Sequence, residues 1–496
     1  MIDLTVARIA EIVGGRLDGV TAEEAQNLHV TGTVEFDSRA VTSGGLFLAL
    51  PGARADGHDF AAQAVADGAV AVLAARPVGV PAIVVPPVAA LDSHAADRKA
   101  GVLEHDADGS GAAVLAALAR LAAAVAAELV AGGLRIIGIT GSSGKTSTKD
   151  LIAAVLRPLG DVVAPPGSFN NELGHPWTVL RATEDTDFLV LEMSARHPGN
   201  IAALARIATP SIAAVLNVGT AHLGEFGSRE VIAQTKGELV EALPASGVAI
   251  LNADDPMVAA MASRTRARVV NVGRGRSAQV RAEDVTLDEL ARPSFTLASA
   301  AGRVPVTLAV HGEHQVSNAL CAAAVALECG ATPEQVADAL AGAGPASRHR
   351  MEVRTTPDGV TVVNDAYNAN PDSMRAGLQA LAVMAGSGDD RRRTWAVLGE
   401  MGELGEDSIT EHDRVGRLAV RLDISRLVVV GTGRPMSAMH QGAVMEGSWG
   451  SESVMVPDAE SALELLRAEL QPGDVVLVKA SNAAGLGALA EALVNP

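Results

Sequence analysis

The sequence is poor in cysteine. Only two of its 496 residues are cysteines, Cys321 and Cys329, and both fall on one expected helix. Eight residues of helix separate them by about 12 Å along its axis, which is too far for a disulfide. We therefore expect two buried thiols in a reducing cytoplasm rather than a disulfide-stabilised fold.

Positive charge is also scarce. Lys and Arg together number 39 against 58 Asp and Glu, which gives a formal net charge of −19. A surface that binds a nucleic-acid backbone needs clustered Lys and Arg to displace counterions. The balance argues against a nucleic-acid partner, although local cations and metal ions could still bind an anionic substrate.

Lysine is the rarer of the two cations. Five of the 39 basic residues are lysines, so arginine serves almost everywhere that charge alone is needed. A lysine that remains is a candidate for work that needs a compact amine able to lose its proton. This reasoning singles out Lys145 and Lys236.

The sequence lacks a charge-free apolar run of membrane length. Residues 112–131 come nearest, but Arg120 and Glu128 interrupt them and alanine dominates. A packed helix without stable membrane insertion is the better interpretation. The opening "MIDLTVARIAEIVGG" contains acidic residues and predicts a Thr-capped helix ended by Gly14, not a secretory leader. We expect a cytoplasmic protein.

The chain divides into several blocks. Residues 1–88 alternate short apolar runs with turns and helical pieces, and 89–133 combine a polar insertion with an alanine-rich connecting helix. In 134–345, runs such as "LRIIGIT" and "FLVLEMS" are continuously apolar, as strands covered on both faces require. A second strand-helix alternation fills 346–496. We therefore predict an α/β protein in which a central, doubly wound, mostly parallel sheet is flanked by a small α/β N-terminal domain and a Rossmann-like C-terminal domain.

A glycine-rich segment follows the first strand of the central block. "GITGSSGKTSTKD", residues 138–150, lies between a strand and a helix that begins near Gly144. Backbone amides at such a helix start bind phosphate oxygens, a lysine reaches the terminal phosphates and a threonine hydroxyl binds Mg²⁺. A plain Gly/Ser turn is the competing interpretation. The expected ATP-binding residues of this loop are Gly141, Ser142, Ser143, Gly144, Lys145, Thr146 and Ser147.

This loop resembles that of the Mur ligases, ATP-dependent enzymes of peptidoglycan precursor synthesis, whose pattern is Gly-x-x-Gly-Lys-Thr. Further segments resemble the members of that family that add D-alanyl-D-alanine, and they occur in the same order through all blocks. The amino-terminal stretch "EFDSRAVTSGGLFLALPG" resembles the domain that binds the substrate nucleotide. The other matching segments are "SFNNELGHP" (168–176), "LEMSARHPGNI" (191–201), "NVGTAHLGEFGS" (217–228), "TKGEL" (235–239), "GEHQVSNALCA" (312–322), "RHRMEV" (348–353) and "NDAYNANPDSM" (364–374).

The resemblance implies a peptide ligase that phosphorylates a substrate carboxylate with ATP. An amine then attacks the acyl phosphate, and ADP and phosphate are released. Because two anions must approach each other in the first step, charge has to be neutralised as it builds. The resemblance implies catalytic roles for Lys145, Glu192, His222, Lys236 and Arg350, and two Mg²⁺ sites whose ligands are Thr146, Glu192, His222 and a Lys236 carbamylated by CO₂.

These residues have plainer interpretations when the resemblance is set aside. Glu192 could be an exposed carboxylate at a strand end, and His222 a structural histidine. Lys236 could be a helix-surface lysine near Glu238. The intact "TKGEL" segment and the scarcity of lysine favour the functional interpretation.

The resemblance also assigns contacts to the substrates. It places Asn318 against adenine, and Arg350 and Asp365 against the phosphates and the ribose. The implied partners are UDP-N-acetylmuramoyl-tripeptide and D-alanyl-D-alanine, bound by a chain that we expect to be a monomer. The expected substrate-binding residues are Asp37, Ser38 and Arg39 on the uridine diphosphate side, and Asn170, Asn171 and Glu172 on the peptide side.

The sequence departs from the family pattern near its end. "VKASNAAGL", residues 478–486, replaces the expected Lys-Gly-Ser-Arg, so Lys479, Ala480 and Asn482 are given no role. His349 stands where the family commonly has tryptophan.

Two other functions compete with this one. A sister ligase could add a diamino acid or glutamate, but the Asp-Asn-Pro-Arg segment typical of diamino-acid adders is absent. A nucleotide-dependent regulatory module would explain the phosphate loop alone. It would not explain the presence of the other candidate site residues, Glu192, His222, Lys236 and Asp365.

Overall fold

The computed structural model describes residues 1–87, 103–220, 223–447 and 452–495. The chain forms two compact units. One contains residues 1–138, 160–194 and 201–212, and the other contains residues 139–159, 195–200 and 213–496. The predicted α/β class with several mostly parallel sheets is confirmed.

The first 87 residues form a small sheet with short helices. The predicted first helix, α1 (Val6–Val13), is capped by the Thr5 side chain and ends at Gly14, whose φ of 65° is left-handed. β2 pairs antiparallel with β7, and the other pairs are parallel. The sheet order is β2 (Arg16–Asp18), β7 (Ala82–Val84), β6 (Ala69–Ala74), β5 (Gly45–Leu48), β4 (Val34–Glu35); β1 (Leu4–Thr5) and β3 (His29–Val30) form a separate pair, and α2 (Ala22–Asn27) and α3 (Ala61–Ala66) complete the block.

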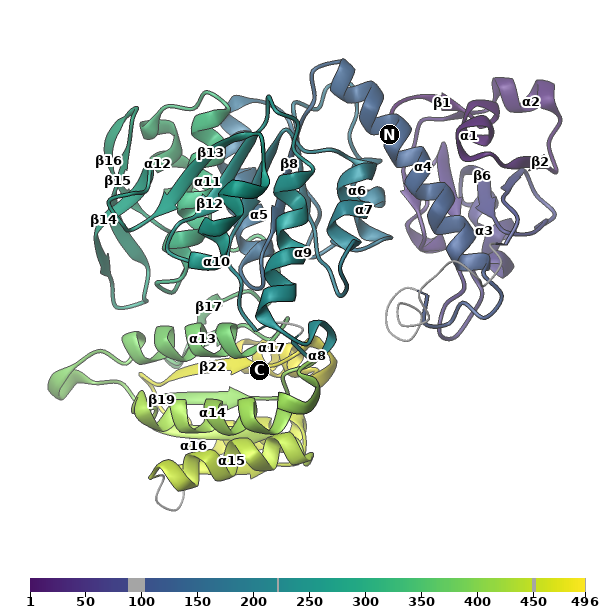
Figure 1. Ribbon diagram of the computed structural model, residues 1–496. Coiled ribbons are helices and arrows are strands. Elements are labelled where there is room, and N and C mark those ends of the chain that lie inside the picture. The colour runs from purple at the N-terminus through teal and green to yellow at the C-terminus, as the bar shows by residue number, and fades with distance from the viewer. Residues whose placement is uncertain (88–102, 221–222, 448–451, 496) are drawn as a thin grey trace. The chain divides into compact units, whose positions relative to one another are not determined.

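The alanine-rich segment forms one long helix, α4 (Ser110–Ala131), beside α1 (Figure 1). Arg120 donates from its guanidinium to the Val13 carbonyl at 2.7 Å. Asp106 is buried and accepts the amides of Gly111 and Ala112, so this end of the predicted polar insertion packs as the start of α4. Residues 88–102 of that insertion lie outside the described residues. In the part of the chain that the structure describes, α4 alone is long and apolar enough to cross a membrane, and 56% of its most apolar window is buried.

The central sheet has nine strands. β9 and β10 pair in parallel, as do β12, β13 and β14, whereas β14, β15 and β16 pair antiparallel. Its order is β16 (Gly302–Thr307), β15 (Pro293–Ser299), β14 (Val280–Leu287), β13 (Arg268–Gly273), β12 (Val248–Asn252), β11 (Ile212–Val215), β8 (Arg135–Thr140), β10 (Phe188–Glu192), β9 (Val162–Val163).

Among the described residues of this block, eight helices accompany the sheet in the sequence. α11 packs against both α5 and α12, and α11 is buried along most of its length. The helices are α5 (Lys145–Leu156), α6 (Gly174–Val179), α7 (Asn200–Ile207), α8 (Leu223–Phe226), α9 (Arg229–Glu241), α10 (Pro256–Ala259), α11 (Gln315–Glu328) and α12 (Pro333–Gly342).

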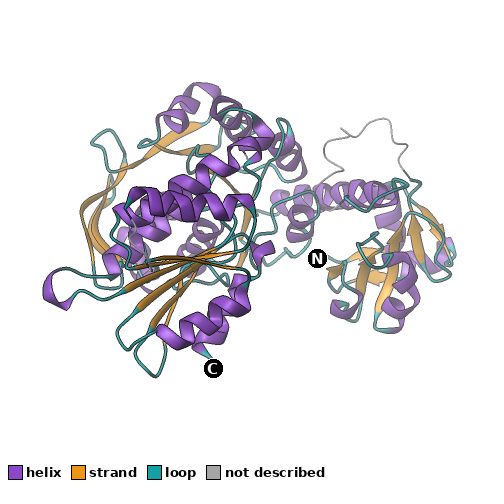
Figure 2. Cartoon of the chain, turned by 90° about the horizontal axis from the view of Figure 1, so that it is seen from below, coloured by secondary structure: helices purple, strands orange, loops and turns teal. Residues whose placement is uncertain are grey.

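The last block is a six-stranded sheet with helices on both faces (Figure 2). Successive residues of each central strand enter opposite cores, which explains why these strands are apolar throughout. The order is β17 (Glu352–Thr355), β18 (Thr361–Asn364), β22 (Val475–Lys479), β19 (Thr394–Leu398), β20 (Arg426–Val430), β21 (Ser453–Val456), parallel except for β17. One core takes side chains of α13 (Pro371–Met384), α14 (Ser408–Arg421) and α15 (Arg434–Glu446), and the other takes those of α16 (Ala459–Glu469) and α17 (Leu486–Val494).

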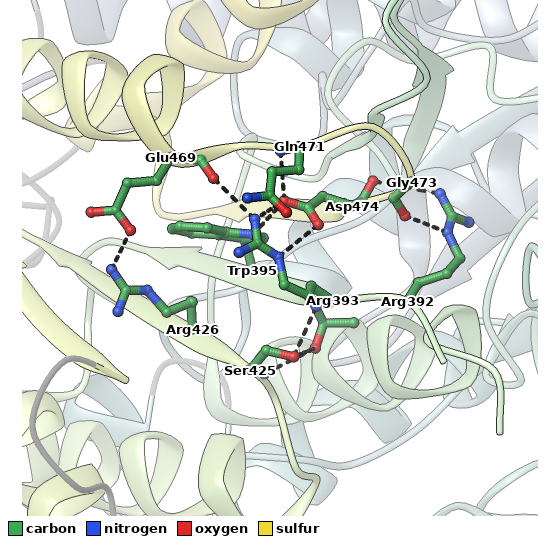
Figure 3. Close-up of polar contacts among 10 residues, drawn as sticks. Arg392, Arg393, Trp395, Ser425, Arg426, Glu469, Gln471, Gly473 and Asp474 are labelled. Carbon is green, nitrogen blue, oxygen red and sulfur yellow. Dashed lines mark hydrogen bonds and ion pairs between the residues drawn. The ribbon is translucent and has the colours of Figure 1, made fainter. Parts of the chain in front are cut away.

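A polar cluster joins the starting ends of three strands in this sheet (Figure 3). Asp474, just before β22, accepts from Arg393 at 2.6 Å, from the Trp395 indole at 3.0 Å and from the Gln471 amide at 3.0 Å. Arg393 and Arg426 both lie over the Trp395 ring. The cluster supplies hydrogen bonds to the buried Asp474 carboxylate and links the starting ends of these three strands. The candidate site described below lies at the other ends of the strands.

Candidate active site

The glycine-rich segment forms a loop between β8 and α5, the place where the sequence predicts a phosphate-binding loop. It is called the phosphate-binding loop below for that predicted role. Gly144 has a φ of 79°, and an added Cβ would lie 2.6 Å from Asn318 Oδ1. Glycine is therefore required here for conformation and for space. Lys145 begins α5 and donates from Nζ to the Gly141 carbonyl at 2.8 Å.

Asn217, which follows β11, fixes the first half of this loop. Its Oδ1 accepts the amides of Ser142 and Ser143 at 3.0 Å each, and its Nδ2 donates to the Ser143 carbonyl at 3.1 Å. The first amides of a helix have no acceptor within the helix. The first turn of α5 therefore presents the amides suited to an anion, while those of Ser142 and Ser143 are engaged by Asn217. Sequence reasoning missed Asn217, although its place after a buried strand was a usable signal.

Arg350 joins the third block to the phosphate-binding loop. It donates from Nη2 to Thr146 Oγ1 at 3.2 Å, and its guanidinium lies 4.3 Å from the centroid of the Tyr367 ring. Its Nε is buried without a hydrogen-bond partner among the described residues. His349 and Met351 have φ values of 56° and 50°, so left-handed residues flank the arginine. An unsatisfied donor held by a strained backbone next to a phosphate-binding loop suits a bound anion.

Asp365 follows β18, the strand that pairs with β17, and it is buried. It accepts the Met351 amide on Oδ1 at 3.1 Å and the Lys479 ammonium on Oδ2 at 2.6 Å. Burial lowers the pKa of Lys479, and Asp365 opposes this shift. Burial also lowers the pKa of the nearby His314 to about 4. Sequence analysis assigned no role to Lys479, yet its ammonium forms an ion pair with Asp365, a predicted nucleotide-binding residue.

Asn318 lies on α11. It donates from Nδ2 to Gln315 Oε1 at 2.9 Å, and its Oδ1 faces Gly144 as described above. Asn318, the residue predicted to contact adenine, therefore lies next to the phosphate-binding loop.

Lys236 is buried in α9, with only 4% of its surface exposed. Its pKa lies well below the ordinary value, because burial penalises the charged ammonium and Lys145 adds repulsion. Glu238 instead accepts the Gly199 amide at 2.6 Å. The interpretation of Lys236 as a surface lysine is therefore wrong.

Glu192 ends β10 in the first unit and is buried. It accepts hydrogen bonds from Ser168 at 2.9 Å and from Asn170 at 2.6 Å, so Asn170 contacts Glu192 directly. Asn171 accepts the Gly174 amide and thereby caps the start of α6, whereas Glu172 is exposed. The interpretation of Glu192 as an exposed carboxylate is wrong. His222 lies outside the described residues.

The predicted uridine diphosphate residues form a small exposed cluster. Arg39 donates to both carboxylate oxygens of Asp37, at 2.9 and 2.7 Å, and these bonds hold the pKa of Asp37 at about 2. Ser38 begins the 3-10 turn that Asp37 caps.

The described residues also limit the kinds of metal site. Nowhere among them do three His, Cys, Asp or Glu side chains gather closely enough to hold a metal ion. Neither cysteine forms a disulfide, and burial raises the pKa of the Cys321 thiol to about 12. Thr146, in contrast, offers a hard oxygen next to the phosphate-binding loop, which suits Mg²⁺ shared with a bound phosphate.

Family models match most of the chain. The Mur ligase family catalytic domain matches residues 31–123, the Mur ligase middle domain matches 139–326, and the Mur ligase glutamate ligase domain matches 349–482.

Curated relatives match over the whole length. The UDP-N-acetylmuramoyl-tripeptide–D-alanyl-D-alanine ligase of Mycobacterium bovis is 72% identical, covering 100% of this chain and 98% of that protein. The Escherichia coli ligase of the same name is 33% identical, with 99% of each chain covered.

Solved structures agree with these relatives. MurF from Acinetobacter baumannii has a TM-score of 0.81 at 29% identity, covering 100% of this chain and 99% of that one. MurF ligase from Thermotoga maritima in complex with ADP has a TM-score of 0.75 at 27% identity, covering 94% and 98%. Three family models in order, full-length identity and a shared three-domain fold agree: the chain belongs to the Mur ligase family.

Proposed function

We propose that this chain joins D-alanyl-D-alanine to UDP-N-acetylmuramoyl-tripeptide at the expense of ATP, in peptidoglycan precursor synthesis. The observation that carries the proposal is the 72% identity, over the whole chain, to a curated ligase of that name. The γ-phosphoryl group passes to the tripeptide carboxylate, which becomes an acyl phosphate. The dipeptide amine then attacks the acyl carbon, a peptide bond forms, and phosphate leaves with ADP already formed.

The nucleotide is held by the second unit. The first-turn amides of α5 and the Lys145 ammonium neutralise the phosphates, and Arg350 supplies its unsatisfied Nε to the same charge. Asn318 contacts adenine and Asp365 accepts the ribose hydroxyls. The ADP complex of the Thermotoga maritima relative supports nucleotide use by this fold.

Two Mg²⁺ ions belong to the proposed site, and they supply positive charge where the transferred phosphoryl group becomes most negative. The ligands are Thr146, Glu192 and His222, with a carbamylated Lys236. Support for the carbamate comes from the burial of Lys236, because a buried amine that loses its proton readily can take up CO₂. The ammonium of Lys236 would repel Mg²⁺. Carbamylation would replace this cation with oxygen atoms that can bind Mg²⁺.

The acceptor substrate is held by residues of the first unit. Asp37, Ser38 and Arg39 contact the uridine diphosphate group, and the loop of Asn170, Asn171 and Glu172 contacts the peptide. We also propose that the chain works as a monomer in the cytoplasm, which sedimentation and cell fractionation would test.

Phosphate release tests the proposal most directly. Purified protein with ATP, Mg²⁺ and UDP-N-acetylmuramoyl-tripeptide should release phosphate with D-alanyl-D-alanine, and only at background level with a free diamino acid or glutamate. Turnover with a diamino acid but not with the dipeptide would identify a sister ligase. Phosphate release that is independent of any amine would indicate a nucleotide-dependent regulatory module.

A further inference from the structure

Lys479 ends β22 inside the six-stranded sheet, and only 2% of its surface is exposed. Its ammonium donates to Asp365 Oδ2 at 2.6 Å and to the Asn368 carbonyl at 3.0 Å. Burying an ammonium is costly unless it is paired and hydrogen-bonded. The fold meets this cost at the strand ends, where parallel sheets place their ligands.

The carboxylate that Lys479 holds is fixed at both oxygens. Oδ1 accepts the Met351 amide, which follows directly after Arg350 in the chain. Oδ2 takes the lysine, and the aliphatic part of Lys479 lies beside Gly377 in α13, where an added Cβ would come within 3.3 Å of Lys479 Cδ. Each carboxylate oxygen keeps a second lone pair, so Asp365 can still accept hydroxyl groups.

We infer that Lys479 is a positioning residue for nucleotide recognition: it holds Asp365 in the rotamer that accepts the ribose hydroxyls. The inference rests on the proposed contact between Asp365 and ribose. Without the ammonium, the carboxylate would be free to rotate, and the hydroxyl contact would be lost with it.

The charges around this pair explain why a lysine stands here. Arg350 and the buried His314 both lie close enough to influence Lys479 or Asp365. A compact ammonium fits between a carboxylate and a carbonyl, whereas a planar guanidinium needs more room. Lysine is otherwise scarce in this chain, which fits a position where arginine cannot replace it.

The test is nucleotide binding by titration calorimetry, with ADP compared with 2′,3′-dideoxy-ADP. The wild-type chain should bind ADP about tenfold or more tightly than the dideoxy compound, as expected for hydrogen bonds to a charged acceptor. In Lys479→Met and Lys479→Gln, ADP affinity should fall, and the ratio between the two nucleotides should approach one. Two variants are used because glutamine keeps a donor for the Asn368 carbonyl and is less disruptive to folding.

Asp474→Asn is the matched control. Asp474 precedes the same strand at its other end and is held by Arg393 and Trp395 (Figure 3), so the change weakens the same sheet away from the nucleotide. It should lower the melting temperature and leave the ratio of ADP to dideoxy-ADP affinity at the wild-type value. A general loss of stability would lower both affinities together, without changing their ratio.

The outcomes separate the inference from the function on which it rests. If wild type discriminates, Asp365→Asn does not, and both Lys479 variants keep the wild-type ratio, the inference is wrong and the role of Asp365 stands. If wild type itself binds both nucleotides equally, the proposed ribose contact is wrong and the inference fails with it.

Discussion

At the scale of single residues, Lys236 has the environment that its proposed modification needs. It is buried, and its lowered pKa makes the neutral amine available to CO₂. Lys236→Ala should lose most activity because it removes a proposed metal ligand. A short carboxylic acid such as acetate should restore part of the rate by occupying the vacated space.

Lys236→Arg is the matched variant for this prediction. It keeps a positive charge but cannot form a carbamate, and it should be inactive with or without acetate. Steady-state phosphate release at several acetate concentrations provides the measurement. An active arginine variant would show that Lys236 acts only as a cation.

His175 in α6 should make stability depend on pH. Burial lowers its pKa to about 4, and both ring nitrogens lack a hydrogen-bond partner among the described residues. The folded chain therefore binds this proton less readily than the unfolded chain, whose histidine titrates near 6.5. The stability that neutral His175 contributes is complete above about pH 6.5 and is lost as the pH falls to about 4, by up to about 3 kcal/mol.

His175→Gln removes the titrating group and should flatten this part of the pH profile. The measurement is the difference in melting temperature between the variant and wild type from pH 7 to pH 4. A constant difference between His175→Gln and wild type across this range would contradict the prediction.

At the scale of elements, the turn from β8 into α5 depends on Gly144. At this position the left-handed backbone would destabilise an alanine by about 1 kcal/mol or more. The added Cβ would also lie too close to Asn318 Oδ1. Gly144→Ala should therefore weaken ADP binding at least tenfold, as measured by calorimetric titration, because both the loop and the adenine residue must shift.

Gly330→Ala separates these two costs. Gly330 follows α11 with a φ of 99°, and an added Cβ would meet open space. Alanine at this position is therefore destabilising only through the left-handed backbone. It should lower the melting temperature and preserve ADP affinity. Equal effects of the two substitutions on ADP binding would mean that the contact with Asn318 is unimportant.

The strands that could be predicted from the sequence are those in which nearly every residue, on both faces, is buried. Strands β8, β10 and β19 are buried on both faces, so their apolar runs indicate them directly. The antiparallel strands β14 to β16 were not predicted. In β14 apolar positions alternate only in part with charged ones, because one face is exposed and the pairing with β15 shifts register after Glu283.

The residues of the candidate site also differ in how far they could be predicted, according to whether their contacts are local in sequence. The phosphate-binding loop is local in sequence, so its glycines and Lys145 could be recognised from their place between a strand and a helix and from the resemblance to the Gly-x-x-Gly-Lys-Thr pattern. Asn217 acts on a loop 74 residues away, and Lys479 on a carboxylate 114 residues away. Both are single polar residues that end buried strands. Their partners are decided by which strands lie together in a sheet, and the sequence pattern does not contain that information.

At the scale of the whole molecule, the residues proposed to bind the two substrates lie in different units. Those proposed for the uridine diphosphate group lie in the first unit, and the phosphate-binding loop lies in the second. Lys145→Ala should therefore abolish turnover and weaken ADP binding, because the phosphates lose their cation, while UDP-N-acetylmuramoyl-tripeptide binds as in wild type. Separate calorimetric titrations of the two ligands provide the measurement, and near-wild-type turnover would reduce the loop to a structural turn.

The placement of the lysines has a practical consequence for chemical labelling. Among the four lysines that the structure describes, Lys149, Lys236 and Lys479 are almost fully buried, and Lys145 is half-buried in the phosphate-binding loop. Reagents that acylate amines therefore meet few accessible lysines in the part of the chain that the structure describes. Lys145 is the most accessible of the four. Its acylation, followed by peptide mass spectrometry, should be blocked by bound nucleotide and so would report the occupancy of the ATP site.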